Sequence, residues 1–224
     1  MFLGLVGLGA AGVVFGSAVS GWLSRVASPI TAADRTGLAG LLPLQGFRLY
    51  TVTGGFPRRD PAEYRLTVGG LVERPYTLTF EELRALPAVA MTKDFQCVTG
   101  WRVDDVRWRG VLLRDLLDRA GVRADGAAVR FTSFDGVYTE SLTLDQAARD
   151  DVVVAYEMQG EPLSSDHGGP VRLYVAPMYG YKSIKWLDGI EVTDRVVPGY
   201  WERSGYDVDA WVGGSNGRRD APIS

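Results

Sequence analysis

The sequence predicts an α+β fold that is rich in β-strand and contains only short helices. Short apolar or alternating runs recur after residue 47, and glycine, proline or aspartate residues interrupt them. Two Thr-x-x-Glu/Gln capping boxes each predict the start of a short helix. One segment has the longer apolar periodicity of an amphipathic helix, and the sequence has no repeat of 20–50 residues. Strands that are separated by short helices, without regular βαβ units, therefore predict an α+β fold.

The first predicted elements lie between residues 64 and 97. Residues 64–68 alternate between polar and apolar side chains, which predicts a strand that ends at the two following glycines. Thr79 and Glu82 form a capping box, so we expect a short helix that ends near Leu86, just before a proline. Residues 91–97 are typical of a strand that enters a loop.

The next elements include the clearest helix. Residues 111–120 place four leucines on one face, and Gly121 follows as the glycine that commonly ends a helix. Residues 127–134 and 138–142 are strand-like, and the Asp135-Gly136 pair between them predicts a hairpin.

The last elements are again mostly strands. Thr143 and Gln146 form the second capping box. Residues 152–158, 171–176 and 184–192 are apolar runs of strand length.

The chain is predicted to divide into four parts. Residues 1–28 form an apolar export signal or membrane anchor, because the first 24 residues carry no charge and are long enough to span a bilayer. A buried N-terminal helix is the alternative. Residues 29–46 form a linker, residues 47–212 the globular domain and residues 213–224 a flexible tail. This organisation predicts an extracytoplasmic protein, either periplasmic or at the cell surface.

Composition excludes several kinds of function. A net charge of −3 gives no electrostatic argument for nucleic acid. The chain has one cysteine, Cys97, and one histidine, His167, so it can form neither an internal disulfide nor a zinc site with several Cys and His ligands. A lone thiolate is, however, suited to a soft metal whose other ligands come from a cofactor.

Six motifs occur in an order that resembles one known family. They are FQCVTGW at 95–101, WRG at 108–110, YTESLTLDQA at 138–147, AYEMQGEPL at 155–163, DHGGPVRL at 166–173 and GYKSIKWLDGIEV at 180–192. Together they resemble the molybdopterin-dependent oxidoreductases of the sulfite oxidase family, which includes the catalytic subunit of the periplasmic methionine sulfoxide reductase. The resemblance covers roughly residues 47–212 and implies a β-rich, sulfite oxidase-type molybdopterin-binding fold.

The resemblance implies a cofactor, a metal ligand and a catalytic tyrosine. Cys97 would give its thiolate to molybdenum, and a metal lowers the pKa of a thiol so that it binds deprotonated. Tyr138 matches a tyrosine beside the metal. His167 and Arg172 would hold the pterin phosphate and ring, since arginine can bind an oxyanion bidentately.

Further residues are implied in the cofactor pocket. Ser183, Ile184 and Lys185 match a position where backbone amides and a lysine hold the cofactor. Either Thr132 or Ser133 matches a cofactor-contacting hydroxyl, and we take Ser133 as the candidate. Thr53 stands where the family has an asparagine.

The expected function is oxygen-atom transfer on a small substrate, either sulfite or a sulfoxide or N-oxide. Val98 to Trp101 replace the arginine-rich stretch of sulfite oxidases, which favours the reductase branch. Electrons would pass to or from a separate partner, such as a membrane haem or quinone-linked protein, and the catalytic domain would be monomeric. Two alternatives stay open: a thiol enzyme that uses Cys97 and His167, and a membrane-anchored binding domain that has lost the cofactor.

Overall fold

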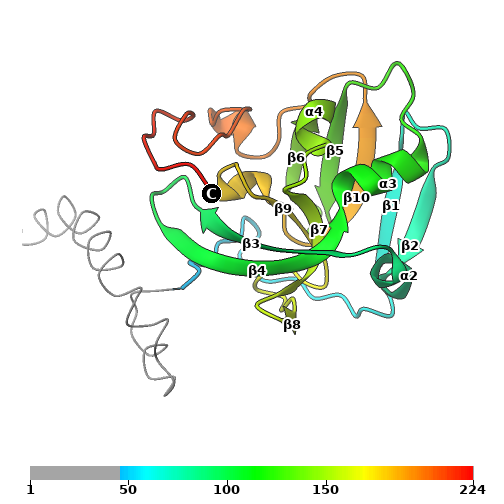
Figure 1. Cartoon of the computed structure of the whole chain (residues 1–224), viewed down its shortest axis with the longest axis horizontal. Helices are drawn as coiled ribbons and strands as arrows, with labels where there is room; N and C mark the ends of the chain where they lie inside the picture. Colours follow the sequence, from blue (N-terminus) through cyan, green and yellow to red (C-terminus); the bar gives the residue numbers. More distant parts are fainter. Residues whose placement is uncertain (1–45, 224) are drawn as a thin grey trace, which may run out of the picture. The chain divides into compact units, whose positions relative to one another are not determined.

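The computed structural model describes residues 46–223, so the predicted leader of residues 1–28 and nearly all of the predicted linker lie outside the described residues. One compact unit spans Leu49–Ser224. It contains two five-stranded sheets with short helices around them (Figure 1). In residues 46–223, no helix combines the length and the hydrophobicity that a bilayer crossing requires.

The first sheet has the strand order β2-β1-β10-β5-β6. Only the β1–β10 pair is parallel, and the other three pairs are antiparallel. Its strands are β1 (Arg65–Gly70), β2 (Tyr76–Thr79), β5 (Ala128–Ser133), β6 (Thr139–Thr143) and β10 (Leu187–Thr193).

The second sheet has the order β3-β4-β7-β8, and β9 pairs with β7. The long strand β4 curves across the molecule beside β3 (Figure 1). Asp105, at φ +53°, lies close to a register shift between β3 and β4. Its strands are β3 (Val89–Gln96), β4 (Arg102–Leu112), β7 (Val152–Met158), β8 (Glu161–Pro162) and β9 (Arg172–Val175).

The helices are short, as the sequence predicts. Both capping boxes are confirmed: Thr79 and Glu82 start one helix, and Thr143 and Gln146 start another. The C-cap of the longest helix is Gly121, at φ +70°. The helices are α2 (Phe80–Ala85), α3 (Leu113–Ala120) and α4 (Leu144–Ala147), with the 3-10 turns η2 (Gly180–Lys182) and η3 (Glu202–Ser204).

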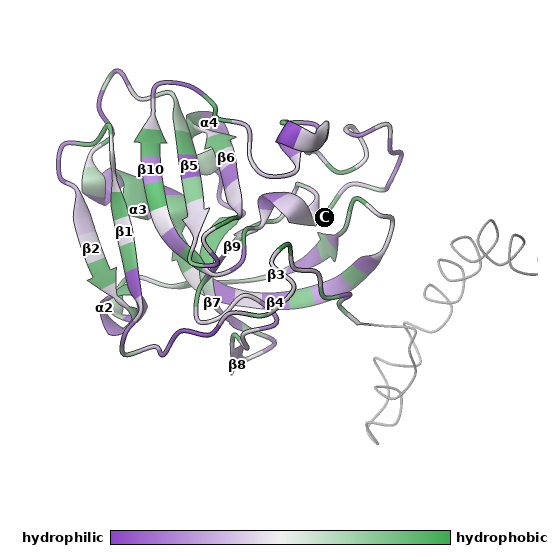
Figure 2. Cartoon of the chain, turned by 180° about the vertical axis from the view of Figure 1, so that it is seen from behind, coloured by the Kyte–Doolittle hydropathy of each residue, from purple (hydrophilic) through white to green (hydrophobic). Residues whose placement is uncertain are grey.

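Apolar side chains from both sheets and from α3 form one core. Apolar residues are concentrated along the strands of the first sheet and along α3 and β9 (Figure 2). Residues 152–154 of β7 and residues 173–175 of β9 are almost fully buried, which explains their continuous apolar sequences.

The sequence prediction differs from the structure in element boundaries and in missed strands, and the strand predicted from residue 184 begins at Leu187. The helix predicted from residue 111 begins at Leu113, because Val111 and Leu112 pair with β7 as the end of β4. Strands β2, β4 and the two-residue β8 were not predicted. The charged pair Asp104-Asp105 interrupts the alternation of β4, which hides a strand that is 11 residues long.

The segment after residue 212, predicted to be a flexible tail, folds back onto the domain. Arg102 donates to the carbonyl of Ala221, and the Tyr179 hydroxyl donates to Asp220 over 3.0 Å. The side chain of Ile223 packs against the core. In Figures 1 and 2 the C-terminus lies near the end of β3.

Candidate cofactor and active site

Cys97 lies in a tight turn between β3 and β4. Its N–H donates to the carbonyl of Trp101 over 2.9 Å, and the Gly100 N–H donates to the carbonyl of Cys97 over 3.0 Å. Gly100 has φ of +100°, a conformation that favours glycine. The thiol is half-buried, and its Sγ lies 3.2 Å from the Thr99 hydroxyl. The turn therefore presents one soft sulfur donor at the end of a strand.

The ring of Phe95 connects this turn with two other segments. A Cβ atom on Gly180 would clash with the Phe95 ring, so glycine lets η2 approach it closely. The guanidinium carbon of Arg172 lies 5.6 Å from the centre of the Phe95 ring and 5.4 Å from that of Trp108. Three predicted motifs therefore meet around one buried aromatic side chain.

Arg172, at the start of β9, is only 2% exposed. Its guanidinium donates to the carbonyls of His167 and Ser183, each over 2.8 Å, and of Leu173 over 3.3 Å. These acceptors are neutral, so they orient the guanidinium without cancelling its charge. Burial lowers the pKa of Arg172 to about 10.

Lys185 and His167 bring further positive charge to the same place. The Lys185 ammonium donates to the backbone carbonyls of Asp166 over 2.7 Å and of Tyr50 over 3.2 Å. Burial, reinforced by the charge of Arg172, lowers the pKa of Lys185 to about 7. Burial also lowers the pKa of His167, and both Arg172 and Lys185 add to that effect. We call His167, Arg172 and Lys185 the cationic cluster.

The cationic cluster is suited to an anion. The Asp166 carboxyl interacts electrostatically with His167 and Lys185, but it also accepts a hydrogen bond from Ser164 and has its pKa lowered chiefly by that bond. A phosphate would offset the repulsion between the buried cations and accept their hydrogen bonds.

Residues 46–223 contain no group of three or more His, Cys, Asp and Glu side chains placed to hold a metal ion.

Tyr138 follows the hairpin turn predicted at Asp135-Gly136, and it is a half-buried hydrogen-bond donor. Its hydroxyl donates to the carbonyl of Tyr181 over 2.7 Å, and its ring stacks on Tyr200. Burial raises the pKa of Tyr138 well above its usual value of 10, and the carboxyl groups of Glu140 and Glu202 raise it further. The hydroxyl therefore stays protonated at neutral pH.

A second buried charged group lies near Tyr138, and the sequence did not predict it. Lys182 is 0% exposed and contacts both Glu140 and Glu202, with 2.6 Å between Lys182 Nζ and Glu140 Oε2. We call these three residues the carboxylate–lysine triad. Burial raises the pKa of Glu140 to about 8, and Glu202 adds to the effect while Lys182 opposes it.

Ser183 and Ile184 support the site rather than point into it. The Ser183 hydroxyl accepts from the Val175 N–H, and its carbonyl accepts from Arg172. The Ser183 and Ile184 amides donate locally, to Gly180 and Lys182. These two amides, predicted to hold a cofactor, are therefore already used within the turn.

The remaining predicted residues have local partners. The Ser133 hydroxyl accepts from the Asp135 N–H, and Thr132 donates to Asp188 over 3.1 Å. Thr53 is exposed and its hydroxyl lies 3.1 Å from that of Thr51. The segment that carries Thr53 reaches the cationic cluster through the carbonyl of Tyr50, which accepts from Lys185.

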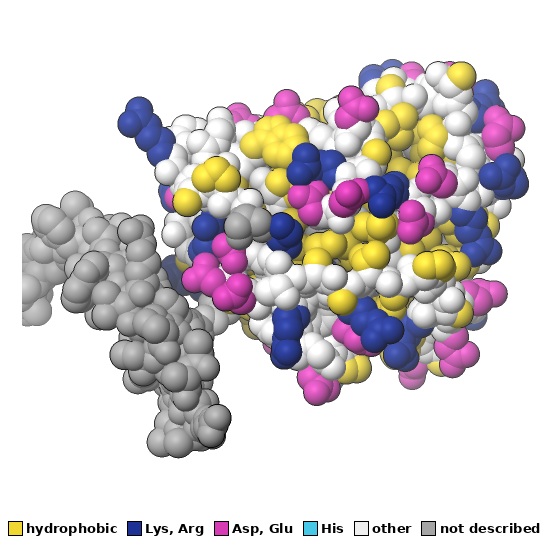
Figure 3. All heavy atoms as spheres, viewed as in Figure 1, with side chains coloured by type: hydrophobic (Ala, Val, Ile, Leu, Met, Phe, Trp, Pro, Cys, Tyr) yellow, Lys and Arg dark blue, Asp and Glu magenta, His cyan; other side chains and the backbone are white. Residues whose placement is uncertain are grey.

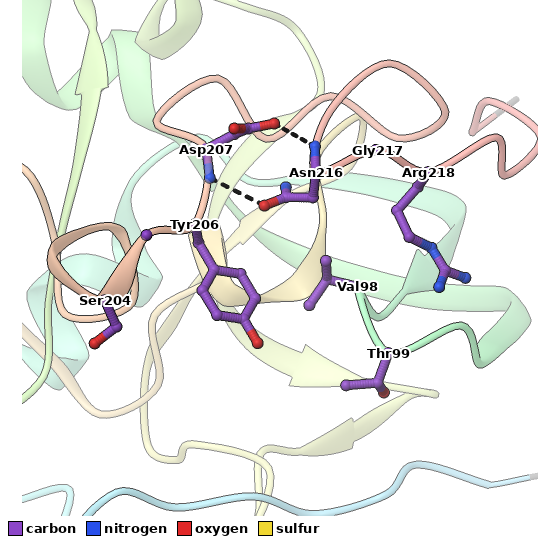
Figure 4. Close-up of a pocket in the computed structure, with 9 residues that line it drawn as sticks. Val98, Thr99, Ser204, Tyr206, Asp207, Asn216, Gly217 and Arg218 are labelled. Carbon is purple, nitrogen blue, oxygen red and sulfur yellow. Dashed lines mark hydrogen bonds between the residues drawn. The ribbon is translucent and has the colours of Figure 1, made fainter. Parts of the chain in front are cut away.

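A hollow of about 530 Å³ adjoins the Cys97 turn. Sequence reasoning missed it because most of its wall comes from beyond residue 203. Figure 4 shows the Tyr206 ring directed toward Val98 and Thr99, with Asn216 on the neighbouring loop and Arg218 on the far side of Val98 from Tyr206. Its lining residues are Val98, Thr99, Ser204, Gly205, Tyr206, Asp207, Asn216, Gly217 and Arg218.

Charges of both signs are interspersed on the face of the molecule shown in Figure 3. That face has no broad region of a single charge, and the cationic cluster is instead largely buried.

Comparison with protein families gives one match across the site. The model described as "Oxidoreductase molybdopterin binding domain" matches residues 53–201. The match includes the Cys97 turn, Tyr138 and the cationic cluster, and it ends before most of the residues that line the hollow.

Several proteins are similar to the chain over most of that range. The uncharacterized oxidoreductase YuiH of Bacillus subtilis is 40% identical over 163 residues, which cover 71% of this chain and 81% of YuiH. The sulfite oxidase of Arabidopsis thaliana is 33% identical, with 65% and 46% coverage. The crystal structure of the sulfane dehydrogenase SoxCD from Paracoccus pantotrophus has a TM-score of 0.62 at 26% identity, with 72% and 48% coverage. The chain thus spans about half the length of these last two proteins.

Proposed function

The chain belongs to the oxidoreductase molybdopterin-binding domain family, and from this premise we propose that Cys97 is the protein's thiolate ligand to molybdenum. The protein is a molybdopterin-dependent oxidoreductase. The finer proposal is that it transfers an oxygen atom to or from a small substrate and exchanges electrons with a separate redox protein.

The chemistry of the available donors fits this cofactor. Cys97 offers a soft sulfur donor. Arg172 and Lys185 offer buried positive charge for the pterin phosphate, with the weakly basic His167 beside them. Gly168 fits because a Cβ atom there would meet Lys185, so the loop of His167 can lie directly against that lysine.

When bound, the cofactor supplies two-electron redox chemistry and the centre of oxygen-atom transfer. The protein's own residues orient and insulate that centre. The turn hydrogen bonds between Cys97, Gly100 and Trp101 hold the sulfur in place. The Tyr138 hydroxyl already donates to the Tyr181 carbonyl and can still accept a hydrogen bond, but it does not ionise to act as a base, because its pKa is well above 10.

The electron partner and the location are further parts of the proposal. The sequence of this chain contains no haem-binding Cys-x-x-Cys-His motif that would supply a second redox centre beside the molybdenum cofactor. We therefore propose that electrons are exchanged with a separate partner, such as a membrane haem or quinone-linked protein. The uncharged residues 1–24 support an extracytoplasmic location, by export or by anchoring. Fractionation of cells that express the full chain would test this location.

The observation that carries the proposal is the cationic cluster, in which Arg172 is buried and its guanidinium carbon lies 5.6 Å from the ring centre of Phe95, two residues before Cys97. The test is molybdenum and pterin content of protein made with molybdate, compared between wild type, Cys97→Ser and the exposed control Thr67→Ser. We expect near-stoichiometric cofactor in the wild type and the control, and a loss of turnover of more than about 100-fold in folded Cys97→Ser. Full turnover in Cys97→Ser would overturn the ligand assignment.

The same proteins separate the two alternatives. A thiol enzyme would keep its activity without molybdenum and would lose it on treatment with iodoacetamide. A cofactor-less binding domain would contain no molybdenum even when the same host loads a control molybdoenzyme.

A further inference from the structure

The hollow beside the Cys97 turn has a size that suits an organic ligand. Its volume of about 530 Å³ falls within the range of about 300–1,000 Å³ that is typical of small-molecule sites. An inorganic oxyanion of a few atoms would fill only a small part of it. The Thr99 hydroxyl, in its wall, lies 3.2 Å from Cys97 Sγ, so the hollow directly adjoins the proposed metal ligand.

One wall of the hollow is aromatic and rigidly supported. The Tyr206 ring contacts Tyr181 edge-on, with 5.5 Å between ring centres, and lies 5.4 Å from the ring of Trp201. In Figure 4 the Tyr206 side chain points into the hollow, opposite Val98. Such a wall can pack against an apolar or aromatic substituent of a ligand.

The second wall is polar and already hydrogen-bonded. The Asn216 side chain accepts from the Asp207 N–H and donates to the Tyr181 hydroxyl, each over 3.0 Å. The Asp207 carboxylate in turn accepts from the Asn216 N–H. These reciprocal bonds join the two C-terminal loops into one wall.

The lining has no excess of positive charge. Its charged residues are Arg218 and Asp207, and Arg218 is held bidentately by Asp220, over 2.9 and 3.1 Å. A sulfite anion would therefore meet a guanidinium that Asp220 already neutralises. The surplus of positive charge lies instead in the cationic cluster, which the proposed function assigns to the pterin phosphate.

We infer that this hollow is the substrate pocket, that it selects uncharged organic oxides, and that Tyr206 is a specificity-determining residue. The inference rests on the proposed function. The substrate would carry a dipolar S–O or N–O group next to Cys97 and an apolar substituent against Tyr206. In the reaction the S–O or N–O bond breaks, two electrons come from the redox partner and two protons from solvent, and a sulfide or amine leaves with water.

The test compares three substrates with the cofactor-loaded full chain and reduced viologen as the electron donor. Methyl phenyl sulfoxide should have a KM about tenfold lower than dimethyl sulfoxide, because its phenyl ring packs against Tyr206. Tyr206→Ala should remove this difference, whereas Tyr206→Phe and the exposed neighbour control Val208→Ala should keep it. Sulfite oxidation, measured with an artificial acceptor, should have the lowest kcat/KM.

A binding measurement makes the test independent of turnover. The unreactive methyl phenyl sulfone should bind wild-type protein and bind Tyr206→Ala about tenfold more weakly in calorimetry, with Tyr206→Leu as a second variant if the alanine protein does not fold. Efficient sulfite oxidation that Tyr206→Ala leaves unchanged, in molybdenum-loaded protein, would overturn this inference and leave the proposed function intact. Protein without molybdenum would instead overturn the proposed function, and sulfone binding would still decide whether the pocket is correctly placed.

Discussion

The carboxylate–lysine triad and the cationic cluster differ in how their charges are balanced. In the carboxylate–lysine triad, Lys182 contacts two carboxyl groups, and every member is at least nine-tenths buried. In the cationic cluster, Arg172 and Lys185 donate to backbone carbonyls, which carry no formal charge. The triad therefore neutralises itself, whereas the cluster has positive charge left for a ligand.

This difference separates a structural role from a binding role. The triad joins three segments of the fold, namely β6 through Glu140, η2 through Lys182 and η3 through Glu202. At neutral pH the raised pKa of Glu140 keeps that carboxyl largely uncharged, so the ion pair of Lys182 with Glu202 is compensated within the protein, as a structural ion group requires. Lys185 shows the opposite situation, because burial lowers its pKa to about 7 and so disfavours its charged form in the folded protein. A bound anion would stabilise that ammonium group.

The largest expected effect comes from Lys182→Met, which leaves two carboxyl groups buried without their cation. We expect a loss of about 3–5 kcal/mol in the free energy of unfolding. Thermal unfolding should show a fall in Tm of about 6–20 °C. Adding Glu140→Gln to this variant should recover part of the loss. A Lys182→Met protein with wild-type Tm would show that the triad does not stabilise the fold.

The next effect is on cofactor content. Lys185→Met should weaken retention of the cofactor by about 1.5–3 kcal/mol, because it removes one charge-assisted contact to the phosphate. Pterin released per chain should fall, while the Tm of cofactor-free protein stays the same or rises, since a destabilised charge is lost. The control is Arg195→Met, an exposed cation. Full pterin content in Lys185→Met would place the phosphate elsewhere.

The sequence predicts local structure well where one short pattern determines it. Residues 152–158 form β7 with the predicted bounds, and both capping boxes start helices where Thr79 and Thr143 indicate. The family match and the fold of the similar SoxCD structure confirm the fold class. Strand β4 was missed because Asp104 and Asp105 break its alternation at a bulge, which depends on pairing with β3 rather than on local sequence.

The candidate site shows the same limit. The sequence motifs identify Cys97, Arg172 and Lys185, and the structure brings their segments together around Phe95. The triad could not be predicted, because nothing in the sequence indicates that Glu140 and Glu202 meet at Lys182. The wall formed by Tyr206 also depends on the way the C-terminal segment folds back.

The pH dependence of stability should have opposite signs in the two groups. The pKa of Glu140 is raised to about 8, so the folded protein binds more protons than the unfolded chain above pH 4.5 and loses stability as pH rises toward 8. The pKa of Lys185 is lowered to about 7, so cofactor-free protein gains stability between about pH 7 and 10.5.

Two substitutions separate these contributions in cofactor-free protein. Glu140→Gln should remove the loss between pH 5 and 8, and Lys185→Met should remove the gain above pH 7, each seen as a change of a few °C in the Tm profile. Bound cofactor should suppress only the Lys185 contribution, because a phosphate restores the ordinary pKa of that ammonium. If bound cofactor suppressed the Glu140 and the Lys185 contributions equally, ligand binding would also change the pKa of Glu140 in the triad.

The smallest effect is expected at Tyr138, whose hydroxyl interacts electrostatically with Glu140 and Glu202 of the triad and with Arg172 of the cationic cluster. Tyr138→Phe removes the hydrogen bond to Tyr181 and should cost about 0.5–1.5 kcal/mol of stability. Turnover of loaded enzyme should fall severalfold while the shape of its pH profile between 6 and 9 stays the same, because this hydroxyl does not ionise in that range. If the substitution instead removed a basic limb from the profile, Tyr138 would be an acid that titrates during turnover, and the two buried groups would be coupled through it rather than separate.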